Sequence, residues 1–173
     1  MKKPPGIVWD PGKSAQDNAA EILPAMARRL FGAGRRLARG KPKLKRLHEF
    51  RLQVKQFRYT LELFEPLYGA GLSGRLAKLR ELQQRLGRIN DCVATRALVG
   101  AAGDLAGAAR VLKHIERAQR RRVAGFVRFW NKEFDGPGEE EAWVECLRHP
   151  RADSARTRPR RTASPALPPP RRS

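Results

Sequence analysis

The segment LHEFRLQVKQFRY, residues 47–59, combines a row of cations with an apolar stripe. An α-helix turns by about 100° per residue, so side chains at positions i, i+3, i+7 and i+10 fall within an arc of about 80°. The basic side chains of the segment have this spacing: His48, Arg51, Lys55 and Arg58. The neighbouring arc carries apolar side chains typical of a core face: Leu47, Phe50, Val54, Phe57, Leu61 and Phe64. The pattern predicts an amphipathic helix over residues 43–67.

The row of cations on this helix would be about 15 Å long and has two interpretations. Like charges at i, i+3 and i+4 repel one another and slightly destabilise a helix. The row is either the solvated face of a basic protein or a surface that binds a polyanion. The spacing alone favours neither interpretation.

The rest of the chain also has the periodicity of helices. Apolar side chains predict three more long helices, over residues 14–39, 73–99 and 104–134, and a short one over residues 139–147. Ser14 supplies a helix-start signal, with an acidic residue three positions later. No segment has the period of two that is typical of strands. We therefore expect an all-α fold, a bundle of about four long helices.

The length of 173 residues fits one domain with two tails. Residues 1–13 are rich in Pro, Gly and Lys and predict a flexible arm, while residues 14–147 hold the periodic segments. Residues 148–173 alternate arginine with Pro, Ser, Thr and Ala. Such a composition has too few apolar side chains to offset the entropy of ordering, so a disordered basic tail is expected.

The charge balance indicates polyanionic partners. The chain has 37 Lys and Arg against 17 Asp and Glu, a formal net charge of +20 and a pI near 11.4. This charge is typical of proteins that bind nucleic acid, inorganic polyphosphate or an anionic membrane surface. No apolar run approaches membrane-spanning length, so a cytoplasmic chain without a membrane partner is expected. Cys92 and Cys146 fit no metal-ligand spacing and are expected to be free thiols.

Catalytic and metal-binding patterns are not evident. His48, His114 and His149 are far apart in the sequence and have no metal-ligand spacing. The acidic run 139–141 is typical of a solvated helix start, and no glycine-rich phosphate loop is present. We therefore expect a protein that is not an enzyme and needs no metal or cofactor.

Cations on the other predicted helices are further candidates for an anion site. If two or more helices turned them toward one groove, they would form a basic channel. The offsets of His48, Arg51 and Lys55 recur in the helix over residues 104–134, either as an internal repeat or by chance in an arginine-rich chain. The additional candidates are Arg28, Arg35, Lys78, Arg85, His114, Arg117 and Arg121.

Polar residues interrupt the apolar rhythm of the helix over residues 73–99. Gln83 and Asn90 fall in that rhythm, and buried amides need hydrogen-bond partners, so an internal polar network is expected. Asp91 either pairs with an arginine of the 43–67 helix or is a plain surface acid. His48 is either a phosphate ligand that binds best when protonated or a neutral histidine at the core boundary.

Two blocks of the sequence occur in a characteristic order. The first is His48-x-x-Arg51-x-x-x-Lys55-x-x-Arg58-Tyr59-x-x-Glu62. The second is Leu82-Gln83-x-x-Leu86-Gly87-x-x-Asn90-Asp91. Together they closely resemble the CHAD family, whose name denotes a conserved histidine α-helical domain. The resemblance covers roughly residues 15–134, and the pair of blocks is more specific than either alone.

The resemblance implies an all-helical fold with a strongly basic groove or pore that binds inorganic polyphosphate. Members often sit beside a triphosphate hydrolase domain or locate to polyphosphate granules. Carried over by position, the polyphosphate groove would be lined by His48, Arg51, Lys55 and Arg58. The resemblance gives scaffolding roles to Tyr59, Glu62, Gln83, Asn90 and Asp91.

This chain departs from the family pattern in two ways. Typical members look like two copies of a four-helix unit, whereas this chain has room for about one. A single unit would either bind polyphosphate on an open face or pair with a second copy to rebuild the pore. The hydrolase domain is absent from the sequence, so no hydrolase activity is implied.

The sequence therefore predicts a non-enzymatic polyphosphate-binding domain of the cytoplasm or of polyphosphate granules, with a homodimer as one possible assembly. The alternative is an RNA- or DNA-binding protein that uses the same charge and the tail, with nucleic acid competing as a polyanion. Single-strand binders usually offer exposed aromatic rings to the bases. Here the aromatic residues mostly fall at core spacing, which favours polyphosphate.

Overall fold

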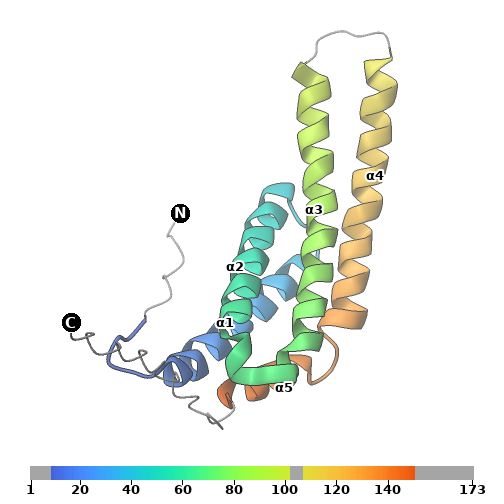
Figure 1. The fold of residues 1–173 in the computed structure, drawn as a ribbon. Coiled ribbons are helices and arrows are strands. Elements are labelled where there is room, and N and C mark those ends of the chain that lie inside the picture. Colours follow the sequence, from blue (N-terminus) through green and yellow to red (C-terminus); the bar gives the residue numbers. More distant parts are fainter. Residues whose placement is uncertain (1–8, 102–106, 151–173) are drawn as a thin grey trace, which may run out of the picture.

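The computed structural model describes residues 9–101 and 107–150, which are helical with no strand. The long helices are α1 (Ala15–Ala38), α2 (Leu44–Tyr68), α3 (Ser73–Ala101) and α4 (Ala108–Phe129), and the short helix α5 spans Glu139–Arg148. A 3₁₀ turn, Gly69–Leu72, joins α2 to α3, and a π-helical turn, Trp130–Phe134, continues α4. The predicted all-α bundle of four long helices is confirmed (Figure 1).

The helix ends follow local chemistry. Ser14 is the N-cap of α1, and its side-chain oxygen accepts a hydrogen bond of 3.1 Å from the backbone N–H of Asp17. Gly69 ends α2 with a φ of 56°, a conformation that residues with a Cβ rarely adopt. The helix-start signal at Ser14 is therefore confirmed for α1. The predicted extent of α2 is correct to within one residue at each end.

The end of the expected N-terminal arm contacts the helical domain. Trp9 stacks on Phe64 with ring centroids 6.1 Å apart, and the Asp10 backbone N–H donates to Asn18 at 2.9 Å. The last residues of the expected N-terminal arm therefore dock on the domain. The structure does not describe residues 1–8, 102–106 and 151–173. Most of the expected C-terminal tail and the expected start of the fourth helix at 104 therefore lie outside the described residues.

The helices are arranged as a compact base with a projecting hairpin. α1 packs against α2 and α5, while α3 packs against α2 and α4. In Figure 1 the antiparallel α3–α4 pair extends well beyond the ends of α1 and α2. Aromatic rings fill the base, with Trp130, Trp143, Phe31 and Phe134 all buried and in ring contact. The two cysteines are free, as predicted.

One buried hydroxyl ties α2 to the end of α5. The Tyr68 hydroxyl donates a hydrogen bond of 2.7 Å to the backbone carbonyl of Leu147, and the Tyr68 side chain is 4% exposed. Burial raises the pKa of Tyr68 to about 12, because the phenolate would lose its hydration.

The free energy of unfolding should therefore fall between pH 10 and pH 12. In this window the folded protein keeps the Tyr68 proton while the unfolded chain, with a pKa near 10.0, loses it. A raised acid pKa of this kind contributes stability below pH 10 that is lost as pH rises toward 12, at up to about 1.4 kcal/mol per pH unit. Urea denaturation at several pH values would measure the slope. Tyr68→Phe should have the shallower slope, and identical slopes would contradict the assignment.

Candidate polyanion-binding groove

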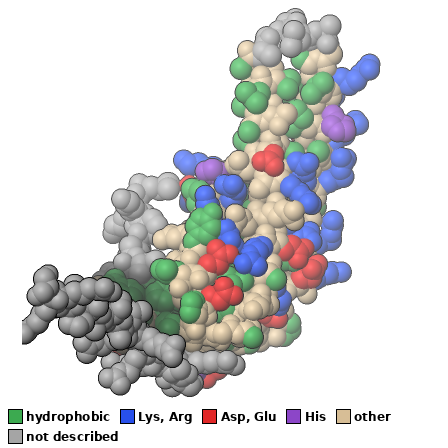
Figure 2. Space-filling model, in the orientation of Figure 1, with side chains coloured by type: hydrophobic (Ala, Val, Ile, Leu, Met, Phe, Trp, Pro, Cys, Tyr) green, Lys and Arg blue, Asp and Glu red, His purple; other side chains and the backbone are tan. Residues whose placement is uncertain are grey.

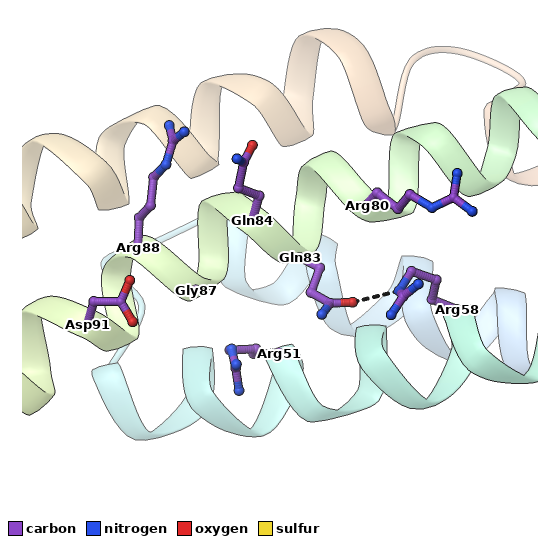
Figure 3. Close-up of a pocket in the computed structure, with 8 residues that line it drawn as sticks. All are labelled: Arg51, Arg58, Arg80, Gln83, Gln84, Gly87, Arg88 and Asp91. Carbon is purple, nitrogen blue, oxygen red and sulfur yellow. Dashed lines mark hydrogen bonds between the residues drawn. The ribbon is translucent and has the colours of Figure 1, made fainter.

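An open groove of about 650 Å³ lies between α2 and α3. Helix α2 contributes Arg51 and Arg58, and α3 contributes the remaining lining side chains (Figure 3). These side chains flank the apolar seam between the two helices, because each helix turns its neighbouring apolar arc toward the core. The α3 residues that line the groove are Arg80, Gln83, Gln84, Gly87, Arg88 and Asp91.

Arg58 is held in place from several sides. Its Nε donates to Gln83 Oε1 at 2.8 Å, and its guanidinium donates to Glu62 Oε1 at 2.5 Å. Arg80 donates to the same Glu62 oxygen at 3.2 Å. The guanidinium carbon of Arg58 lies 4.4 Å from the ring centroid of Tyr59. Arg58 is therefore a fixed positive charge at one end of the groove.

Arg51 differs from Arg58 because its charge is uncompensated. Its side chain is half-buried, and its Nε is buried without a hydrogen-bond partner. No described carboxylate forms an ion pair with it. A buried donor without a partner costs about 1–3 kcal/mol, and more when it is charged. An anion in the groove would recover that cost.

The polar residues predicted on α3 face the cations of α2. Gln83 accepts from Arg58, and Asn90 Oδ1 lies 2.9 Å from His48 Nδ1. Two separate hydrogen bonds therefore join the two sequence blocks across the helix interface. Both amides are half-buried, and no connected internal network is found among the described residues. His48 itself is exposed, one turn before Arg51 along α2, so it does not lie at the core boundary.

The negative charge in the groove is limited. Asp91 lines the groove, yet its carboxylate forms no ion pair with any described residue. The alternative in which Asp91 pairs with an arginine of α2 is therefore not what the structure has. Lys55 lies beside the groove, with its Nζ 5.5 Å from the Tyr59 ring centroid. Four guanidinium groups against one unpaired carboxylate leave the groove strongly positive.

Several candidate cations on other helices belong to ion pairs outside this groove. Arg35 of α1 donates two hydrogen bonds of 2.7 Å to Asp135, which lies in the turn before α5. It also contacts Glu140 of α5, so these contacts join α1 to α5. Lys78 pairs with Glu139 at 2.8 Å. These pairs neutralise charge and hold the base of the bundle together.

Arg85 is also removed from the groove, since it pairs with Glu81 and lies 4.4 Å from the Phe129 ring centroid. Arg28 is exposed on α1, and three further candidates are exposed on α4, which packs on α3 (Figure 1). Two helices, α2 and α3, do line one groove, but these candidate cations are not among its lining residues. The three α4 candidates are His114, Arg117 and Arg121.

Sequence reasoning missed half of the cations that line the groove. Arg80 and Arg88 are eight positions apart on α3, with Gln84 midway between them. This i, i+4, i+8 spacing puts them on one helix face, adjacent to Gln83 and Gly87. This spacing could be found in the sequence, but only the packing of α2 against α3 makes these side chains line one groove with Arg51 and Arg58. In Figure 3, Arg88 and Gln84 project from α3 away from α2.

Other kinds of site find no support in the described residues. No group of three or more His, Cys, Asp or Glu side chains in residues 9–101 and 107–150 could hold a metal ion. Among the same residues, no helix combines the length and apolarity that crossing a bilayer requires.

The fold and the groove together define an all-helical basic domain with arginine side chains gathered between two long helices. The family model for the CHAD domain matches residues 2–100, which include α1, α2, nearly all of α3 and every residue of the groove. The chain therefore belongs to the CHAD family. No curated protein and no solved structure matches the chain.

Proposed function

We propose that this chain binds inorganic polyphosphate, without catalysis, in the groove between α2 and α3. The observation that carries the proposal is the set of four arginines around one groove, in which the buried Nε of Arg51 lacks a partner. The CHAD family, to which the chain belongs, is associated with polyphosphate binding.

The groove suits a linear phosphate polymer. Guanidinium groups fork onto phosphate oxygens through two parallel N–H donors, and Arg51, Arg80 and Arg88 are free or nearly free to do so. Arg58 supplies a fixed charge that the Gln83 and Glu62 contacts orient. His48, anchored by Asn90, extends the same row along α2.

The groove suits single-stranded nucleic acid less well. Sequence-tolerant binders of single strands stack bases on exposed aromatic rings. Among the described residues, Trp9 and Tyr59 are the large exposed aromatic side chains. Trp9 is stacked on Phe64, and Arg58 and Lys55 lie over the Tyr59 ring. The rings are therefore already occupied by the protein's own side chains.

Arg51→Gln should weaken binding of labelled long-chain polyphosphate by about fivefold near 0.1 M salt. The reason is that the loss of one phosphate contact withdraws the release of about 0.7 counterion from a single-stranded polyanion. Because Arg51 makes no ion pair, the variant should keep its helicity and stability. Fluorescence titration over a salt series, with RNA of equal charge as competitor, would measure the effect.

The matched control is Arg29→Gln, which removes the same charge from an exposed position on α1. It should bind polyphosphate nearly as tightly as the wild type. A folded Arg51→Gln protein with unchanged affinity would remove the groove from the proposal. Full displacement of polyphosphate by RNA would favour a general polyanion binder.

A further inference from the structure

A second basic surface runs along α4. Its cations project from one face of the helix, within an arc of about 100°, over a length of about 27 Å. All of them are exposed, and Figure 2 shows basic side chains along the outer edge of α4. We call this surface the α4 ridge; it comprises Arg110, Lys113, His114, Arg117, Arg121 and Arg128.

The side chains of the α4 ridge have no ion-pair or hydrogen-bond partner among the described residues. Helix α4 has a single acidic residue, Glu116, and that carboxylate pairs with Arg120 at 2.6 Å. Elsewhere in the described chain, the bundle neutralises cations such as Arg35 and Lys78. Like charges at i, i+3 and i+4 cost a helix about 0.2–0.5 kcal/mol per pair, so the ridge is unfavourable in the free protein.

The ridge differs from the groove in shape. It lies along one helix of a hairpin that projects from the bundle (Figure 1), whereas the groove lies between two helices. The apolar face of α4, which includes Ile115, Phe126 and Phe129, is buried against the bundle. A helix that lies in a bilayer surface must insert its apolar face, so α4 cannot bind a membrane in that way.

The straight row of cations is complementary to a rigid, wide polyanion. Duplex nucleic acid carries one phosphate charge per about 1.7 Å of its axis, and its major groove, about 12 Å wide in B-DNA, admits a helix. A duplex is too wide to enter the groove of about 650 Å³ between α2 and α3. The ridge consists of Arg, Lys and His side chains, and Arg and Lys are residue types that contact phosphate oxygens, so we expect contacts to the phosphates.

We propose that the α4 ridge binds the phosphate backbone of duplex nucleic acid, independently of sequence and at a site separate from the α2–α3 groove. One chain could then hold a duplex on α4 and a linear phosphate polymer between α2 and α3.

The test uses the full chain and a labelled duplex of about 20 base pairs, a length that exceeds the ridge. The variant Lys113→Gln/Arg117→Gln/Arg121→Gln should bind the duplex at least about tenfold more weakly near 0.1 M salt, and its salt slope should shrink by about three. These side chains do not line the groove, so polyphosphate binding should persist. Arg51→Gln should weaken polyphosphate binding and leave duplex binding nearly unchanged. The two variants together therefore distinguish failure of this proposal from failure of the polyphosphate proposal.

The matched control is Arg156→Gln/Arg158→Gln/Arg160→Gln, which removes the same charge from the C-terminal tail. Circular dichroism checks that each variant is folded. The proposal is overturned if the ridge variant loses no more duplex affinity than the tail variant. It is equally overturned if the ridge variant loses binding to phosphatidylserine vesicles while its duplex affinity stays unchanged.

Discussion

Gly34→Ala should lower the unfolding temperature by several degrees, although alanine is the better helix former. A Cβ at Gly34 would lie 2.1 Å from Cη2 and 2.2 Å from Cζ2 of Trp130, far inside van der Waals contact. Trp130 is fully buried and in contact with the rings of Phe31, Phe50 and Phe134, so it cannot swing away.

The two opposing effects differ in size. Overpacking a core costs about 1–3 kcal/mol and occasionally more. Replacing glycine by alanine inside a helix returns about 1 kcal/mol. Because the predicted contact involves a packed indole and not a flexible chain end, we expect a net loss of about 2 kcal/mol. Thermal and urea denaturation followed by circular dichroism would measure it.

Gly32 provides a control two residues away in the same helix. A Cβ there would meet only Arg36 Nη1, at an ordinary distance of 3.5 Å. Gly32→Ala should therefore leave stability unchanged or raise it by up to about 1 kcal/mol. Equal unfolding temperatures for the two variants would show that Trp130 has room to move.

The helices themselves could be predicted from the sequence because their signals are local. The spacing of Phe50, Val54 and Phe57 marks α2, and the Ser14 cap marks the start of α1. The π-helical turn at Trp130–Phe134 was not predicted, since it depends on rings that arrive from α1 and α5. Periodicity shows which face of a helix is buried, but not which helix covers it.

The same limit applies to the groove. Arg51 and Arg58 were predicted from one helix, where spacing decides the face. Arg80 and Arg88 needed the packing of α3 against α2, and Arg35 needed its partners Asp135 and Glu140, which are at least 100 positions away in the chain. A single sequence shows that a residue is charged. Residues that are distant in the sequence determine whether that charge forms an ion pair within the fold or remains unpaired and able to bind a ligand.

Three groups of described cations therefore differ in their surroundings. One group, which includes Arg35, Lys78 and Arg85, is paired with carboxylates and stabilises the bundle. A second group lines the groove, and the third forms the α4 ridge. If net charge alone governed binding, removing the same number of cations from the groove or from the ridge would weaken binding of every polyanion equally. Unequal effects would show that the position of the cations matters.

Arg51→Gln/Arg80→Gln/Arg88→Gln should therefore weaken polyphosphate binding by about a hundredfold near 0.1 M salt. Three lost contacts, at about 0.7 counterion each for a single-stranded polyanion, reduce the salt slope by about two. The fold should survive, because the ion pair that is lost, Arg80 with Glu62 at 3.2 Å, is more than half exposed on the arginine side. Titration of labelled polyphosphate from low to high salt would give both the affinity and the slope.

The ridge variant Lys113→Gln/Arg117→Gln/Arg121→Gln has the same net charge as this groove variant and serves as its control. It should retain most of the polyphosphate affinity and nearly the full salt slope, because its substituted side chains do not line the groove. If the two triple variants lost equal affinity, net charge would explain binding and the groove would have no special role. A large difference between two proteins of equal charge can come only from the arrangement of arginines that α2 and α3 create.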